Sequence, residues 1–173
     1  CANVEDADFG DYILDIDVLN NKLFAVLDAK KGEEMIKKIE ELTSLAKVVR
    51  GDIVSMLTES ASGHPGGSLS IADIMTTLFF GEMNITPENP KDENRDRFVL
   101  SKGHAAPVLY SVLARKGYFP VEELNTLRKI NSRLQGHPSM KLIPGIDMST
   151  GSLGQGISAA VGMALAGKVD KKD

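Results

Sequence analysis

Three histidines occur in this sequence of 173 residues, and each of them directly follows a glycine. They are His64, His104 and His137, in the tripeptides GHP, GHA and GHP. Histidine is the side chain best suited to exchange a proton near neutral pH. A preceding glycine allows unusual backbone angles and a close approach of a ligand to the main chain. The repeated pairing predicts three loop histidines that belong to one binding or catalytic site.

Metal binding is a weaker interpretation of the same histidines. No two of them have the three- or four-residue separation of helical zinc ligands, and no HExxH sequence is present. The single cysteine, Cys1, has no partner that would make it a nucleophile. The serines lack a G-x-S-x-G turn, and no P-loop sequence occurs. These patterns predict no metal ligands, no cysteine or serine nucleophile and no P-loop in this chain.

A second candidate site is the glycine-rich sequence GIDMSTGSLGQG at residues 145–156, which opens an apolar helical segment. Free N–H groups at the start of a helix can bind an anion or another ligand. Gly154, Gly156 and Ala159 also match the spacing of a dinucleotide fingerprint, although Pro144 lies in the preceding segment and no clear strand does. A nicotinamide-nucleotide site and a glycine turn that merely packs a helix closely both stay open here.

The elements that must position these loops are mostly helices. Apolar residues recur at three- and four-residue steps in several segments. Ser68 or Ser70 is the expected cap of the helix at 69–80. Only RFVL at 97–100 is typical of a buried strand. This combination predicts an incomplete α/β domain, helix-rich with few strands. The expected helices cover residues 36–59, 69–80, 104–113, 121–130 and 154–166, and the expected loops cover 84–96 and 131–152.

The charge of the chain is unevenly distributed. Residues 1–34 carry nine acidic and three basic side chains, whereas residues 35–173 carry 15 acidic and 17 basic ones. Alternating polar and apolar residues flank Asn20 and Asn21, which predicts a β-hairpin over residues 12–27. We therefore expect an acidic N-terminal extension, 1–34, before a second segment, 35–173.

Composition excludes several classes of protein. The net charge of −4 argues against a nucleic-acid partner, which usually binds a basic surface. No apolar run approaches the roughly 18 residues of a membrane span, so no membrane association is expected. One cysteine cannot form an intrachain disulfide. The expectation is a cytoplasmic protein that acts on small molecules.

Four short sequences resemble, in the same order, successive motifs of the transketolase family. They are SGHPGG at 62–67, LSKGHA at 100–105, QGHP at 135–138 and TGSLGQG at 150–156. The match is to the N-terminal, diphosphate-binding half, most closely the short version in which the enzyme is split over two chains. It covers the chain from about Met35, and residues 1–34 have no counterpart. The related synthase of deoxyxylulose phosphate fits less well, because its early motif does not read SGHPGG.

The resemblance implies a reaction and a set of roles. The reaction is the transfer of a two-carbon ketol unit from a ketose phosphate to an aldose phosphate, with thiamine diphosphate and Mg²⁺. The implied catalytic residues are His64, which contacts the substrate and shares in proton transfer, and His137, which meets the hydroxyls of the two-carbon unit. The implied cofactor-binding residues are His104 beside the diphosphate, and Gly151, Ser152 and Leu153 along the ring portion. Proline is more usual at position 152, and a backbone contact tolerates the change to serine.

The family's metal motif has no counterpart in this sequence, and neither does the domain that supplies its acid–base glutamate. We therefore expect a chain truncated before the metal motif, with the Mg²⁺ ligands elsewhere. The expected partners are sugar phosphates and a complementing C-terminal transketolase chain or domain, in a homo- or hetero-oligomer. The isolated chain is expected to be inactive. The alternative is a non-catalytic fragment or interaction module that retains the fold.

Overall fold

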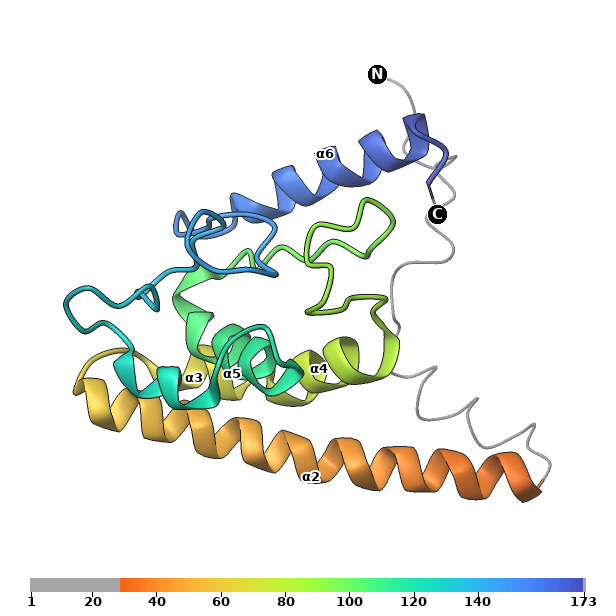
Figure 1. Cartoon of the computed structure of the whole chain (residues 1–173), viewed down its shortest axis with the longest axis horizontal. Helices are drawn as coiled ribbons and strands as arrows, with labels where there is room; N and C mark the ends of the chain where they lie inside the picture. Colours follow the sequence, from red (N-terminus) through yellow and green to blue (C-terminus); the bar gives the residue numbers. More distant parts are fainter. Residues whose placement is uncertain (1–28, 173) are drawn as a thin grey trace. The chain divides into compact units, whose positions relative to one another are not determined.

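A computed structural model describes residues 29–172, with side-chain surroundings from residue 35 onward. By its contacts the chain divides into Cys1–Ile39 and Glu40–Asp173. Helix α2, Ala29–Ser60, begins in the first of these parts and continues into the second (Figure 1). The hairpin expected at 12–27 lies outside the described residues, and the boundary after residue 34 stays a prediction.

Helix α2 confirms the predicted long helix, with a start seven residues earlier than expected. Its buried side chains are Ala46, Val49, Ile53 and Met56, which follow one another at steps of three and four residues. This spacing places them on one face of the helix, where they pack into the core. Ile39 continues the same pattern but is 49% exposed, so the apolar periodicity extends beyond the part of the helix that is covered.

The single helix expected at 69–80 is wrong. The structure has three short elements instead: α3, Pro65–Leu69; α4, Ala72–Thr77; and the π-helical turn η2, Leu78–Glu82. Proline is favoured in the first turn of a helix, which explains a start at Pro65 rather than after the glycines. Neither expected cap is used, since Ile71 precedes α4 and the Ser70 hydroxyl donates to the carbonyl oxygen of Gly67.

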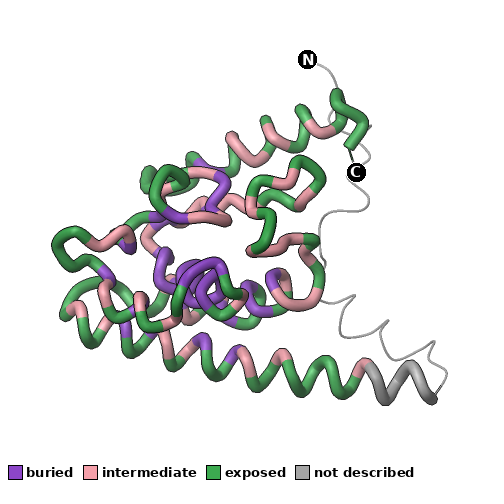
Figure 2. The backbone as a smooth tube through the Cα atoms, in the orientation of Figure 1, coloured by how far each residue is buried: buried purple, intermediate pink, exposed green. Residues whose placement is uncertain are grey.

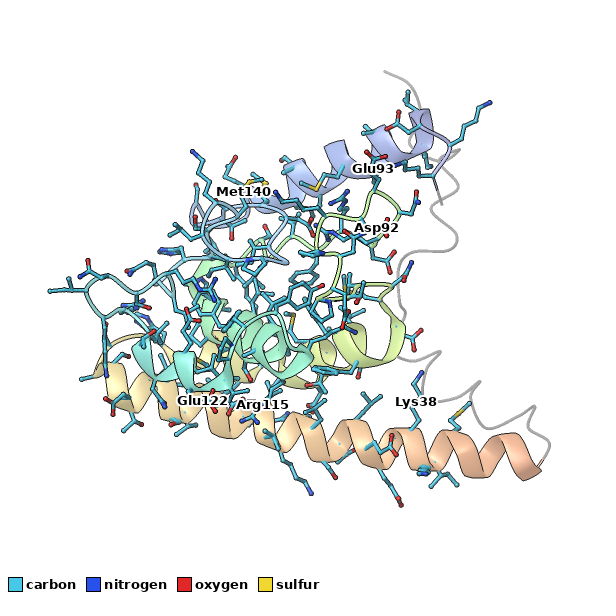
Figure 3. The ribbon with its side chains drawn as sticks, viewed as in Figure 1. Lys38, Asp92, Glu93, Arg115, Glu122 and Met140 are labelled. Carbon is cyan, nitrogen blue, oxygen red and sulfur yellow. The ribbon has the colours of Figure 1, made fainter. Side chains whose placement is uncertain are left out.

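Helix α5, Ala106–Lys116, follows the 3₁₀ turn η3, Gly103–Ala105, and lies at the centre of the core. Every residue from 106 to 114 is buried, as Figure 2 shows by the continuous purple of this helix. It ends at Gly117, whose φ of 97° requires the left-handed region. Near this end Arg115 donates two hydrogen bonds to Asp52 of α2, which joins the two helices (Figure 3).

The segment expected to be a strand, 97–100, forms none. Within residues 29–172 the structure contains no strand, because an extended segment needs a neighbouring one to complete its hydrogen-bond ladder. The N–H of Phe98 instead donates to the carboxylate of Asp147. The helix-rich character is confirmed, whereas the α/β class is not. The two long loops, 84–96 and 131–152, are irregular as predicted, and the helix expected at 121–130 is reduced to the 3₁₀ turn η4, Val121–Thr126.

Helix α6, Gly156–Val169, agrees with the helix expected at 154–166. It is rich in apolar residues, yet Gly156 is its only buried residue. Ile157, Val161, Leu165 and Val169 recur every four residues and are all more than half exposed. They form one apolar stripe along the helix. Figure 2 shows most of this helix in the colours of exposed and intermediate residues. None of the helices in the described part of the chain has the length and apolarity needed to cross a membrane.

Candidate functional site

The first and second motifs, 62–67 and 100–105, contact each other through a glycine and a histidine. A Cβ on Gly67 would lie 3.0 Å from Nε2 of His104, so only a bare backbone leaves room for the ring there. The Lys102 ammonium donates to the Ser70 hydroxyl at 3.1 Å, directly after α3. The imidazole of the second motif is thus held against the first motif, and its ammonium against the end of α3.

The second motif also supports the fourth, 150–156. A Cβ on Gly103 would lie 2.8 Å from the carbonyl carbon of Thr150 and 2.9 Å from the nitrogen of Gly151. The Ser101 hydroxyl accepts a hydrogen bond from the N–H of Ile157, in the first turn of α6, at 3.2 Å. The glycine-rich entrance of α6 is therefore docked on the second motif by main-chain contact.

The third motif, 135–138, lies against the fourth. The Cγ and Cδ2 atoms of His137 are 3.6 Å from the position of a Cβ on Gly151. The Tyr110 hydroxyl, from buried helix α5, donates to the carbonyl oxygens of Gln135 at 2.8 Å and His137 at 3.1 Å. Burial raises the pKa of Tyr110 well above its ordinary value, which keeps the phenol protonated as a donor.

The glycine that precedes each histidine has a packing reason. Gly63 has a φ of 119°, and a Cβ there would lie 2.5 Å from Cδ2 of Leu57. Gly103 meets Thr150 and Gly151, and Gly136 meets the guanidinium of Arg128. Each of these glycines is a point where another segment approaches the main chain too closely for a side chain. The three Gly–His pairs therefore mark close packing, which at Gly103 joins segments that are distant in the sequence.

The predicted site residues do not all lie in the same surroundings. His104 and His137 join one cluster through the contact of Gly103 with Gly151. His64 immediately precedes α3, is exposed, and makes no capping hydrogen bond with its side chain. It enters the cluster through its own motif, because Gly67 contacts His104. Ser152 and Leu153 lie in an exposed turn before α6, with Leu153 70% exposed.

A buried ion-pair network anchors the segment that leads to the fourth motif. Asp147 accepts hydrogen bonds from both Nη atoms of Arg95, from Nη1 of Arg97 at 3.3 Å and from the N–H of Phe98 at 2.8 Å. The side chains of Asp147 and Arg95 are 4% and 8% exposed. Four donors satisfy this buried carboxylate, as its loss of hydration requires.

Three residues outside the motifs hold the site together without being predicted from the sequence. They are Tyr110 and Asp147, described above, and Arg128, whose Nη1 donates to the Ser62 hydroxyl at 2.8 Å. Each acts on a segment that is remote in the sequence, so neither periodicity nor motif spacing could identify it. The φ of 59° at Arg128 distinguishes this residue, but that angle is known only from the structure.

The cluster suits an anionic ligand with a polar ring. Gly151 is exposed, and the rings of His104 and His137 lie against the glycine backbones of Gly67 and Gly151, so imidazole groups supply compact donors beside the main chain. The Thr150 hydroxyl is buried without a hydrogen-bond partner, which leaves one polar atom here unsatisfied. Residues 146–153 before α6 form no strand, so the dinucleotide fingerprint lacks its required context. Over the described residues, no cluster of three or more His, Cys, Asp or Glu could hold a metal ion.

Comparison with known proteins identifies relatives of this arrangement. The family model described as "Transketolase, thiamine diphosphate binding domain" matches residues 41–172. The 6-deoxy-6-sulfo-D-fructose transketolase subunit of Clostridium sp. (strain MSTE9) is 51% identical over 130 residues, which cover 75% of this chain and 47% of the relative. An apulose-4-phosphate transketolase subunit of Phocaeicola vulgatus is 42% identical over 136 residues, covering 79% and 48%.

Solved structures agree with these relatives. The transketolase of Pichia stipitis in complex with sedoheptulose 7-phosphate superposes with a TM-score of 0.70 at 41% identity. That match covers 72% of this chain and 18% of the solved chain. The present chain thus spans about half the length of the curated subunits that it matches, and less of the longer enzymes.

Proposed function

This chain belongs to the transketolase family, within its thiamine diphosphate-binding domain, and on that premise we propose that it is the cofactor-binding part of an enzyme that transfers two-carbon ketol units between sugar phosphates. The observation that carries the proposal is the convergence of the four motifs. The second motif contacts the first and the fourth, and the fourth contacts the third. Motifs spread over 95 residues, 62–156, are thereby in contact, which supports one shared site.

The proposed cofactor ligands are His104, Gly151, Ser152 and Leu153. The His104 ring lies against the backbone of Gly67, an arrangement that supports binding of the diphosphate. Residues 151–153 are exposed, which supports backbone hydrogen bonds from this segment to the aminopyrimidine, although the Ser152 carbonyl already accepts one from the N–H of Gln155. When bound, thiamine diphosphate supplies the nucleophilic carbon that cleaves and re-forms the bond beside the ketose carbonyl.

The proposed catalytic residues are His64 and His137. Both side chains are exposed at the cluster and therefore accessible to a sugar. An imidazole N–H aimed at a carbonyl oxygen stabilises the negative charge that develops on it. The same nitrogen can hold or release a proton near neutral pH. We assign His64 to the carbonyl and neighbouring hydroxyls, and His137 to the hydroxyls of the two-carbon unit.

We further propose Mg²⁺ as the divalent cation, held by residues other than these, and a second polypeptide that completes the site. Relatives of this chain are named as transketolase subunits, and the exposed apolar stripe of α6 offers that polypeptide a surface to cover. The substrates proposed are a ketose phosphate and an aldose phosphate. The single cysteine and these substrates favour carbohydrate metabolism in the cytoplasm.

Complementation tests the proposal. The chain is mixed with polypeptides that supply the remainder of a transketolase, together with thiamine diphosphate and Mg²⁺, and transfer from a ketose phosphate to an aldose phosphate is followed. We expect turnover by the mixture and none by the chain alone. His64→Ala and His137→Ala should each lower kcat/KM by about 100-fold or more. Asn125→Ala, an exposed side chain on η4, is the control expected to change nothing.

The outcomes separate the two candidate functions. Turnover that persists at the parental rate in both histidine variants contradicts the assigned roles. A mixture that assembles without any turnover favours the non-catalytic interaction module. Full activity of the isolated chain contradicts the need for a second polypeptide.

A further inference from the structure

The guanidinium of Arg128 lies between the first and third motifs. Its Nη1 donates to the Ser62 hydroxyl at 2.8 Å. A Cβ on Gly136 would lie 2.8 Å from Nη2 and 3.0 Å from Cζ and Nε, so the group lies against the bare backbone before His137. Its Cζ and Nη2 are also 4.0 Å from the Cβ position of Gly63, the residue before His64. One planar side chain thus lies against the backbone of Gly136 and borders the space beside Gly63.

Within the part of the chain whose side chains the structure describes, Arg128 differs from the other arginines in its partners. Every other arginine of the chain pairs with a carboxylate: Arg50 with Asp73, Arg95 and Arg97 with Asp147, Arg115 with Asp52, and Arg133 with Glu123. Among residues 35–172 no carboxylate forms such a pair with Arg128. Its partners are instead a serine hydroxyl and the main chain of two histidine loops.

The backbone directs this side chain. Arg128 has a φ of 59°, in the left-handed region that residues other than glycine rarely adopt. Its N–H donates to the carbonyl oxygen of Leu134 at 2.8 Å, which closes the turn that leads into the third motif. The turn therefore fixes where the guanidinium begins, and Ser62 and Gly136 fix where it ends.

We propose that Arg128 is a positioning residue that couples the His64 loop to the His137 loop. With it, the contacts between motifs form a closed ring: first to second, second to fourth, fourth to third, and third to first through Arg128. Closure holds the two exposed imidazoles in one relative position. That this position serves a single sugar substrate rests on the proposed function, whereas the coupling itself does not.

Histidine side-chain NMR of the full chain tests the coupling, because only three histidines contribute signals. Arg128→Ala is expected to shift the ring signals of His64 and His137 by more than those of His104. Ser62→Ala removes one hydrogen bond and is expected to shift those of His64 alone. Lys129→Ala is the matched control, because Lys129 is adjacent to Arg128 in the sequence and the substitution removes only its exposed ion pair with Glu59. We expect it to shift none of the three.

Kinetics of the complemented enzyme supply the second measurement. Arg128→Ala should lower kcat by about 10- to 100-fold, the loss typical of misplaced catalytic groups. The Kd of thiamine diphosphate should change less than about twofold, because its proposed ligands belong to the second and fourth motifs, which Arg128 does not contact. Arg128→Lys should not restore kcat, because an ammonium lacks the planar fork that lies on Gly136 and reaches Ser62 together.

Different results overturn different claims. Unchanged ring signals in Arg128→Ala, or equal shifts of all three histidines, overturn the coupling. Full recovery of kcat in Arg128→Lys overturns it too, because charge alone would then suffice. Arg128→Ala could also destabilise the fold, in which case its melting temperature falls below that of Lys129→Ala. The Ser62→Ala spectrum then decides: a shift of the His64 signals supports the coupling, and unchanged His64 signals overturn it. Absence of turnover in the parental mixture overturns the proposed function and leaves the NMR result to decide the coupling.

Discussion

At the scale of single residues, glycine marks the places where segments of main chain meet. Gly103 approaches Thr150 and Gly151, Gly67 approaches His104, and Gly136 approaches Arg128. A side chain at any of these positions would have to displace main chain, an imidazole or a guanidinium. By contrast, Gly51 in α2 has open space around its Cβ position. The same residue type therefore has opposite consequences at these two kinds of position.

Gly103→Ala should separate the second motif from the fourth. Its methyl group would lie 2.8–2.9 Å from main-chain atoms of Thr150 and Gly151, which cannot yield without moving the entrance of α6. We expect thiamine diphosphate affinity in the complemented enzyme to fall about tenfold or more, measured by calorimetry. Gly51→Ala is the control and should stabilise the chain by about 0.5–1 kcal/mol through helix propensity. Equal cofactor affinity in the two variants would contradict the assignment of the contact.

Tyr110→Phe should change the response of stability to pH. Below about pH 10 the variant should be less stable than the parent by about 1 kcal/mol, because two carbonyl oxygens lose their donor. Burial raises the pKa of Tyr110 in the folded state, so its stabilising contribution is complete below the unfolded pKa of about 10 and declines at higher pH. The difference between parent and variant, measured by urea unfolding, should shrink above pH 10. Burial also raises the pKa of Tyr118, but this residue is present in both proteins, so its contribution cancels in the difference.

At the scale of elements, α5 and α6 are both apolar but differ in their surroundings. Residues 106–114 of α5 are all buried, whereas α6 has one buried residue, Gly156. A helix that is apolar on all sides is normally covered on all sides. The exposed stripe of α6 is therefore surface that the described part of the chain leaves without cover.

Val161→Glu on α6 should weaken assembly with the complementing polypeptide. The side chain is 54% exposed, so we expect the stability of the chain itself to change by less than about 0.5 kcal/mol. The Kd for the second polypeptide should rise about tenfold or more, since a charge would be buried in an apolar contact. Val54→Glu is the matched control, because Val54 is 52% exposed on α2. An equal effect of both substitutions on the Kd would show that α6 is not covered.

At the scale of the whole molecule, we propose that the chain provides one part of a larger site. The described residues supply the imidazole and glycine cluster but no strand ladder and no carboxylate cluster for a metal ion. The curated subunits that it matches are about twice as long as the matched region. Cofactor binding should therefore depend on assembly.

Thiamine diphosphate with Mg²⁺ should stabilise the assembled enzyme more than the isolated chain. A ligand that binds only the folded state at 100 times its Kd contributes about 2.7 kcal/mol, and a weaker site contributes less at the same concentration. We expect a clear rise in melting temperature for the complemented enzyme and a small one for the chain alone, measured by differential scanning fluorimetry. Equal rises would indicate that this chain contains the complete cofactor site.

Much of this could be predicted from the sequence because it depends on near neighbours. The apolar periodicity of α2, the helix that becomes α5, the loops around them and the three Gly–His pairs are local features. The four motifs in series are sufficient for the family. Residue spacing carries this information because helix formation and turn chemistry act over a few residues.

Tertiary structure alone decided which of these features meet. Arg128 reaches Ser62 across 66 positions, and Tyr110 reaches Gln135 across 25. The same packing divided the expected helix at 69–80 and left 97–100 without a ladder partner. Such contacts depend on how separate elements fill a common volume, and no pattern within a single element records that.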